Sequence, residues 1–216
     1  MNASPLIHVV DDDEPLRTAL LRLLDMAGFE ARGYASAGEF LLHPPPDRPS
    51  CLLLDVRMPG PSGLDLQGAL EEDGIPLPIV FLTGHADVPS SVQALKGGAV
   101  DFLEKPVQRD ALLAALGRAL ARDAAQREVR VEATRLRALF ATLSTREREV
   151  FDRIVAGKLN KQIADELGIS ERTIKTQRAH LMVKLGVDST VELGALAEKL
   201  SRSAPGTAQR PADMGG

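Results

Sequence analysis

CLLLDVRMPGPSG, residues 51–63, places one acidic residue at the end of an apolar run, and the loop after that residue contains two prolines and two glycines. A short, near-continuous apolar run bounded by turn residues is typical of a strand that is buried on both faces of a parallel sheet. The functional groups of such sheets lie just beyond the carboxyl ends of the strands. The stretch therefore predicts a buried strand that presents Asp55 at a functional edge.

Similar runs recur through the first half of the chain, separated by segments whose apolar residues have helical spacing. Strands that alternate with helices form a parallel sheet covered on both faces. This half is therefore predicted to be an α/β domain with a five-stranded, doubly wound parallel sheet. The expected strands are residues 6–10, 30–34, 51–55, 78–83 and 101–105.

Polar residues follow four of these strands, and the carboxyl ends of parallel strands share one edge of a sheet. Carboxylates gathered at one edge repel one another unless a cation neutralises them, and a small set of oxygen ligands suits Mg²⁺. A lysine and a hydroxyl nearby favour a phosphoryl group over a neutral substrate. Each residue also has an ordinary explanation, as a helix cap, a turn residue, a strand former or a solvated charge. The residues are Asp11, Asp12, Asp13, Asp55, Thr83 and Lys105.

Four motifs within residues 4–122 resemble the receiver domain of two-component response regulators, a flavodoxin-like fold. They are VVDDDEP (9–15), LLLDVRMPGPSG (52–63), VFLTGHAD (80–87) and GAVDFLEKP (98–106). The resemblance implies that a cognate sensor histidine kinase phosphorylates Asp55 in a Mg²⁺-dependent reaction. The metal ligands that it implies are Asp11, Asp12, Asp55 and the backbone carbonyl of Arg57, and the switch residues are Thr83, Phe102 and Lys105.

Two side chains are expected to control dephosphorylation. Arg57 and His85 stand two places after Asp55 and Thr83, near the entry path of hydrolytic water. We therefore predict that they set the lifetime of the phosphoryl group.

The two halves of the chain differ in charge. Residues 1–122 carry 10 Lys and Arg against 17 Asp and Glu, a net charge of −7, whereas residues 123–216 carry 16 against 13, a net charge of +3. The latter value alone is too small to indicate nucleic-acid binding.

Residues 1–122 form the predicted first domain, and residues 123–142 lack Gly and Pro, as expected of a helical linker. Alternatively, four apolar residues of this stretch could form a dimer seam. They are Val131, Leu136, Leu139 and Phe140.

Residues 143–202 are predicted to form a small all-α domain of four helices, followed by a polar, disordered tail, 203–216. The helices lie near 145–156, 160–167, 171–185 and 190–200. Ser144 with Glu147 has capping-box spacing, and Asn160 and Ser170 are acceptable N-caps. The turn LGIS (167–170) has the length and the glycine of a helix-turn-helix. The third helix exposes side chains of the kind that reach bases and phosphates in a major groove.

Residues 143–193 resemble the LuxR-type helix-turn-helix that ends response regulators of the FixJ/NarL group. The motifs are LSTRERE (143–149), NKQIA (160–164), GIS (168–170) and TIKTQ (173–177), and the receiver motifs indicate the FixJ-like branch. The resemblance implies a recognition helix from Glu171, with Ala179 where some relatives carry a lysine. The implied DNA contacts are Lys161, Thr173, Lys175, Thr176, Arg178 and Lys184.

The chain is therefore expected to be a transcription factor that dimerises on phosphorylation and binds promoter duplex DNA, with RNA polymerase as a further partner. We expect no enzyme activity beyond phosphotransfer to Asp55 and hydrolysis from it. A Mg²⁺-dependent aspartyl-phosphate hydrolase is disfavoured because Val56 and Arg57, rather than an acid, follow Asp55. A protein-interaction adaptor is the other alternative, which salt-dependent binding to DNA would exclude.

A cytoplasmic location and no membrane partner are expected. The chain shows no secretory signal and no apolar run of the roughly 18 residues that span a bilayer. Its single cysteine, Cys51, is expected to be a core residue rather than a reactive thiol. His8, His43 and His180 lack the spacing of metal ligands and are expected to be structural or surface residues.

Overall fold

The computed structural model describes residues 4–84, 92 and 94–202. The chain divides into two compact units, residues 1–128 and residues 129–216. None of the helices in the described ranges combines the length and the apolar character needed to cross a membrane.

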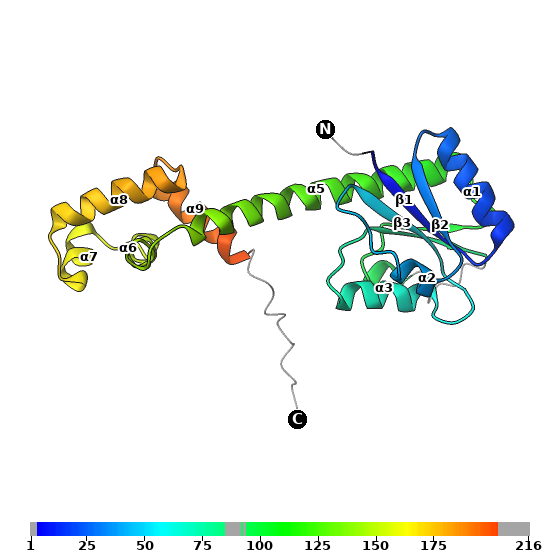
Figure 1. Ribbon diagram of the computed structural model, residues 1–216, viewed down its shortest axis with the longest axis horizontal. Helices are drawn as coiled ribbons and strands as arrows, with labels where there is room; N and C mark the ends of the chain where they lie inside the picture. The colour runs from blue at the N-terminus through cyan, green and yellow to red at the C-terminus, as the bar shows by residue number, and fades with distance from the viewer. Residues whose placement is uncertain (1–3, 85–91, 93, 203–216) are drawn as a thin grey trace, which may run out of the picture. The chain divides into compact units, whose positions relative to one another are not determined.

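The first unit contains the predicted five-stranded sheet (Figure 1). Its strands run in the order β2-β1-β3-β4-β5, and all neighbouring pairs are parallel. This order brings the ends of β1, β3, β4 and β5 to one edge of the sheet, as the α/β prediction requires. The strands are β1 (Leu6–Val10), β2 (Glu30–Tyr34), β3 (Ser50–Asp55), β4 (Ile79–Thr83) and β5 (Asp101–Glu104).

Helices cover both faces of this sheet. On one face, α1 (Glu14–Met26) and the first part of α5 (Arg109–Ala141) bury a core with the inward-pointing residues of β1, β3 and β4. On the other face, α2 (Ala37–Leu41) and α3 (Gly63–Glu72) do the same (Figure 1). Successive side chains of β3 point to opposite faces of the sheet: Leu53 packs in the first core and Leu54 in the second. A strand buried on both faces explains the unbroken apolar run before Asp55.

The second unit is helical. It contains the last residues of α5 together with α6 (Thr145–Val155), α7 (Asn160–Leu167), α8 (Glu171–Leu185) and α9 (Thr190–Arg202). Its core is built around Val150, Ile163, Ile174, Leu181 and Leu193, all of which are fully buried. The four-helix prediction is confirmed, with helix ends within a residue or two of those expected.

Caps explain where these helices begin and end. Ser144 and Glu147 form a complete capping box at the start of α6, and the Ser170 hydroxyl accepts a hydrogen bond from a backbone N–H of α8. Gly168 and Gly186 adopt the left-handed conformation that ends α7 and α8. The prediction of Asn160 as an N-cap is wrong. Asn160 is the first residue of α7, and its side-chain oxygen instead accepts a hydrogen bond from Arg178.

The stretch predicted to be a linker is helical up to Ala141, where α5 ends. Leu136, Leu139 and Phe140 pack against the core of the second unit, so these three apolar residues have partners within the chain. Val131, the fourth residue of the suggested dimer seam, is 69% exposed. Three of the four residues of the suggested seam therefore pack within the second unit, which begins at residue 129.

Candidate functional site

Three carboxylates meet at the predicted edge of the sheet. Asp11 directly follows β1, and Asp55 is the last residue of the neighbouring strand β3. Together with Asp12, they offer oxygen atoms that all lie within 4.8 Å of one another. Asp11 and Asp55 are buried and Asp12 is exposed, so the cluster is open to solvent on one side. Several carboxylate oxygens at this spacing suit a hard divalent cation such as Mg²⁺.

The third acid of the DDD run has a different role. The carboxylate of Asp13 accepts a hydrogen bond from the backbone N–H of Leu16 at 3.0 Å and so caps α1. Its own N–H donates to Asp11 Oδ1 at 2.9 Å. Arg17, one turn into α1, donates to the backbone carbonyl of Asp11 at 2.6 Å. The start of α1 thus fixes the orientation of Asp11.

Lys105 bridges the two buried carboxylates. Its Nζ lies 2.8 Å from Asp11 Oδ2 and 3.0 Å from Asp55 Oδ2. Burial on its own lowers the pKa of this ammonium group, but the hydrogen bonds to the two carboxylates outweigh burial and raise it, so the lysine is charged. Burial raises the pKa of Asp55, assisted by the neighbouring charge of Asp11, although Lys105 acts in the opposite direction. A site with two buried anions and one cation is suited to receive further positive charge.

The expected switch residues lie on the adjoining strands. Thr83 ends β4 and is 1% exposed, and its carbonyl accepts a hydrogen bond from the Lys105 backbone N–H at 2.7 Å. Phe102 in β5 is partly buried, with its ring 6.1 Å from that of Phe81. The structure thus places Thr83 directly beside the strand that leads into Lys105.

Of the two residues expected to control dephosphorylation, one can be placed. Arg57 is exposed, and its backbone N–H donates to Asp55 Oδ1 at 3.4 Å. This contact holds the loop after β3 close to the carboxylate. His85 lies outside the described residues.

A glycine supports the loop after Asp55. The N–H of Gly63 donates to the carbonyl of Val56 at 3.0 Å, which brings the start of α3 back against the end of β3. A Cβ atom at this position would lie only 2.2 Å from the backbone oxygen of Asp55. The sequence showed a glycine in a turn, but only the fold reveals that the close approach to the Asp55 backbone requires one.

In the second unit, the residues expected to contact DNA lie on α7 and α8. Lys161, Thr173, Lys175, Thr176 and Lys184 are exposed, and Arg178 is half-buried. Several already have partners within the chain. Lys184 Nζ lies 2.9 Å from a carboxylate oxygen of Glu147, and Lys175 lies 3.5 Å from Glu171. Arg178 donates to the side-chain oxygens of Asn160 and Thr190, the first residues of α7 and α9.

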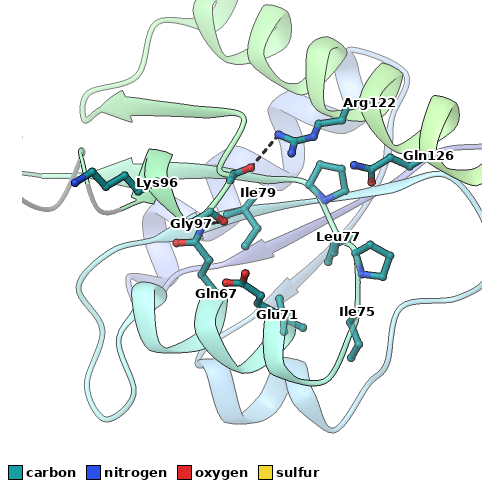
Figure 2. Close-up of a pocket in the computed structure, with 13 residues that line it drawn as sticks. Gln67, Glu71, Ile75, Leu77, Ile79, Lys96, Gly97, Arg122 and Gln126 are labelled. Carbon is teal, nitrogen blue, oxygen red and sulfur yellow. Dashed lines mark hydrogen bonds between the residues drawn. The ribbon is translucent and has the colours of Figure 1, made fainter. Parts of the chain in front are cut away.

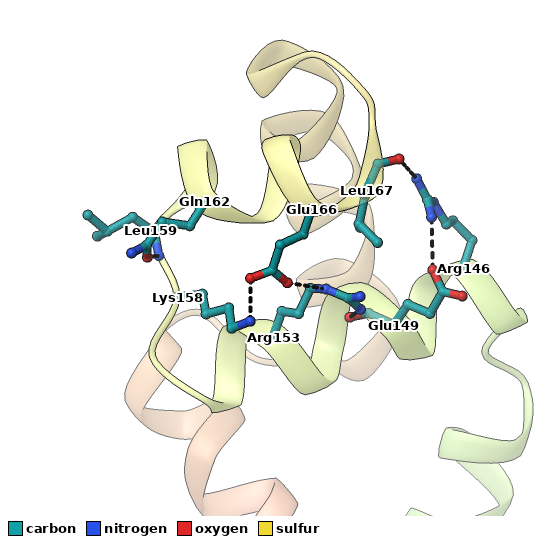
Figure 3. A network of polar contacts seen from close by, with 8 residues as sticks. All are labelled: Arg146, Glu149, Arg153, Lys158, Leu159, Gln162, Glu166 and Leu167. Carbon is teal, nitrogen blue, oxygen red and sulfur yellow. Dashed lines mark hydrogen bonds and ion pairs between the residues drawn. The ribbon is translucent and has the colours of Figure 1, made fainter.

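Polar contacts fasten α7 to α6 (Figure 3). The carboxylate of Glu166 on α7 pairs with Arg153 at 3.0 Å and with Lys158. At the end of α7, Arg146 donates to the carbonyl of Leu167 at 3.0 Å while pairing with Glu149 at 2.8 Å. These contacts assign Arg146 to holding the helices together.

Comparison with known protein families accounts for both units. Residues 7–117 match the family model described as "Response regulator receiver domain", and residues 141–197 match "Bacterial regulatory proteins, luxR family". The chain belongs to the DNA-binding response regulators. It therefore serves two-component control of transcription, and the expected family and fold are confirmed.

Similar proteins match this response regulator over most of its length. It is 45% identical to Nodulation protein W of Bradyrhizobium diazoefficiens, over 94% of this chain and 90% of that protein. It is 41% identical to the transcriptional regulatory protein FixJ of Rhizobium meliloti, over 88% of this chain and 94% of FixJ.

Solved structures of similar proteins share the fold. The response regulator StyR is 45% identical with a TM-score of 0.80, a match that covers 91% of this chain and all of StyR. Full-length FixJ from B. japonicum is 40% identical with a TM-score of 0.56, covering 94% of this chain and 99% of FixJ.

Proposed function

We propose that Asp55 is the phosphoacceptor of this response regulator. The observation that supports the proposal is the bridge from Lys105 to Asp11 and Asp55 beside the exposed carboxylate of Asp12. A buried carboxylate held at a strand end, with a cation in contact and an open side, is arranged to react with a phosphodonor. The surrounding charge is then placed where negative charge accumulates during phosphoryl transfer.

In the proposed reaction, an oxygen of the Asp55 carboxylate attacks the phosphorus of a phosphohistidine on a cognate sensor histidine kinase. The phosphorus–nitrogen bond breaks, the electron pair stays with the histidine, and Asp55 becomes an acyl phosphate. Asp11, Asp12, Asp55 and the carbonyl of Arg57 would hold Mg²⁺, which supplies positive charge to the transferring group. Lys105 contributes a second positive charge. Attack by water on the phosphorus later restores the Asp55 carboxylate and releases inorganic phosphate, and we propose no other reaction.

The phosphoryl group adds roughly 1.5 to 2 negative charges at the end of β3. We propose that Thr83 turns its hydroxyl toward this group and that Phe102 changes position with it. The altered receiver surface would then favour a homodimer. Two DNA-binding units on one promoter add their contacts through high effective concentration, because each small helix-turn-helix alone contacts little DNA.

DNA contacts are proposed for the exposed residues of α7 and α8. Thr173, Lys175 and Thr176 would reach base edges or phosphates from the first turns of α8, and Lys161 would contact a phosphate near the start of α7. Arg178 and Lys184 would exchange their partners within the chain for phosphates. RNA polymerase is a proposed partner at the promoter, and the cytoplasm is the proposed location.

The phosphoacceptor is tested by intact-mass spectrometry after incubation with Mg²⁺ and acetyl phosphate. We expect wild type to gain the mass of one phosphoryl group and Asp55→Asn to gain none. Asp13→Asn is the matched control, because Asp13 lies at the same edge but caps α1, and it should still be phosphorylated. Equal labelling of wild type and Asp55→Asn, or no labelling of wild type, would contradict the proposal.

A further inference from the structure

A buried carboxylate lies far along the sequence from the phosphoacceptor but contacts the same strand. Asp123 on α5 is 1% exposed, and its Oδ2 accepts a hydrogen bond at 2.9 Å from the backbone N–H of Ser50. Ser50 is the first residue of β3, and Asp55 is the last. One turn further along α5, Arg127 Nε donates to the same oxygen at 2.7 Å and also pairs with Asp47. α5 is thus attached to the opposite end of the strand that carries Asp55.

The residue before Asp123 attaches α5 to a second element. Arg122 Nη1 donates to the carbonyl of Gly98 at 2.9 Å (Figure 2). Gln67 on α3 holds the same segment, since its amide donates to the carbonyls of Ala94 at 3.1 Å and Gly97 at 2.8 Å. A Cβ atom at Gly97 would lie 2.8 Å from the Gln67 side chain, so this clamp is close-fitting. The 94–98 segment is therefore fixed from both sides by polar contacts.

A cavity lies beside the contact made by Arg122. This cavity of about 330 Å³ lies where α3, the 94–98 segment and α5 meet, and its lining includes Gln67, Arg122 and Gln126 (Figure 2). Atoms that face a cavity lack partners on that side and gain little from dispersion. The hydrogen bond from Arg122 to Gly98 therefore joins α5 to the segment at the edge of this cavity.

The buried carboxylate of Asp123 requires its hydrogen-bond partners. A buried charge is costly unless it is paired and hydrogen-bonded, so this carboxylate depends on both the Ser50 N–H and Arg127. Beyond these contacts α5 continues to Ala141, and its residues Leu136 and Phe140 pack in the core of the DNA-binding unit. One helix therefore carries both receiver contacts and part of the second core.

We propose that Arg122, Asp123 and Arg127 form a coupling junction through which phosphorylation of the receiver acts on the DNA-binding unit. The inference rests on the proposed function, because it assumes that phosphorylation of Asp55 changes DNA binding. Arg122 connects α5 to the 94–98 segment, and Asp123 connects α5 to β3, so a shift of either element would be passed to α5. The two contacts are positioning contacts, since neither residue touches the phosphoacceptor cluster.

The test compares full-length wild type with Arg122→Ala and Asp123→Asn. Two quantities are measured, the rate of Asp55 phosphorylation by acetyl phosphate with Mg²⁺ and the gain in duplex-DNA affinity on phosphorylation. We expect both variants to be phosphorylated at the wild-type rate while the gain in affinity falls about tenfold, within the usual range of coupling between sites. Arg122→Lys retains a donor and should restore most of the gain.

Arg118→Ala is the matched control. Arg118 lies one turn earlier on α5 and makes an exposed ion pair with Asp101, so its loss removes a comparable arginine without touching β3 or the 94–98 segment. We expect it to behave as wild type. A full wild-type gain in both Arg122→Ala and Asp123→Asn would overturn the junction, as would an equal loss in Arg118→Ala.

A second measurement, made on wild type, tests the junction even if one of the variants fails to fold. In wild type, amide hydrogen exchange at Ser50 should change on phosphorylation, because its N–H donates to Asp123. An unchanged Ser50 amide in phosphorylated protein that binds DNA more tightly would overturn the junction alone. Wild type that is phosphorylated without gaining DNA affinity would overturn the proposed function as well.

Discussion

Mild acid should destabilise the receiver through His8. This histidine in β1 is 1% exposed, and its Nδ1 lies 3.0 Å from the Tyr34 hydroxyl. Its ring stacks on Tyr34 and meets Phe40 edge-on, and its Nε2 has no hydrogen-bond partner among the described residues. Burial, helped by the positive charges of Arg32 and Arg48, lowers the pKa of His8 to about 4. The folded receiver therefore holds this imidazole neutral.

The size of the effect follows from the difference in pKa. In the unfolded chain His8 has a pKa of about 6.5, so between about pH 6.5 and pH 4 the unfolded state binds a proton that the folded state excludes. Stability is full above this window and falls as the pH falls through it. At about 1.4 kcal/mol per pKa unit, the whole shift of His8 is worth roughly 3 kcal/mol. About 2 kcal/mol of this should be lost between pH 7 and pH 5.

Urea denaturation followed by tyrosine fluorescence measures this loss. The chain contains one tyrosine and no tryptophan, and Tyr34 lies in β2, so the signal reports on the receiver alone. We expect wild type to lose about 2 kcal/mol more than His8→Asn when the pH is lowered from 7 to 5. The exposed His43 provides the control, and His43→Asn should retain the wild-type loss. An equal loss in wild type and His8→Asn would show that protonation of His8 is not the cause.

Three further outcomes follow from the structure. Gly63→Ala places a methyl group against the β3 backbone and should cost about 1–3 kcal/mol in thermal unfolding, whereas Gly68→Ala, which meets open space, should cost no stability. Cys51 is fully buried with its pKa raised to about 12 by burial, so mass spectrometry should find it unalkylated by iodoacetamide until urea unfolds the receiver. Glu147→Gln removes the ion pair that Lys184 must leave to reach a phosphate, so DNA affinity should rise; Lys184→Gln should lower the log–log salt slope by about 0.9, and an unchanged slope contradicts this contact.

The sequence was most informative where strand ends converge. Apolar runs marked the strands, and the parallel order predicted that Asp11, Asp55 and Lys105 would meet at one edge, as they do. The sequence did not show which of the neighbouring acids would join the cluster and which would cap the helix. Asp12 and Asp13 are adjacent and chemically identical, yet one joins the cluster and the other caps α1, because the turn into the helix decides the direction of each side chain.

Contacts between distant segments were hidden from sequence reasoning. Asp123 is an acid in a polar helical stretch, a pattern typical of a solvated helix. Only the fold reveals that its carboxylate is buried and accepts a hydrogen bond from the Ser50 N–H. Asn160 has the residue type of a helix cap, but Arg178 from another helix takes its side-chain oxygen. Gln67 likewise gave no periodic signal. In each case the partner is at least 18 residues away, beyond the reach of local patterns.

The proposed switch is tested most directly by duplex-DNA affinity and oligomer mass for wild type and Asp55→Asn, each with and without Mg²⁺ and acetyl phosphate. If phosphorylation of Asp55 is the switch, only wild type, and only with both additions, should double in mass and bind DNA more tightly. Equal DNA binding by both proteins under all conditions would contradict it, because the DNA-binding unit would then act without the receiver's phosphorylation.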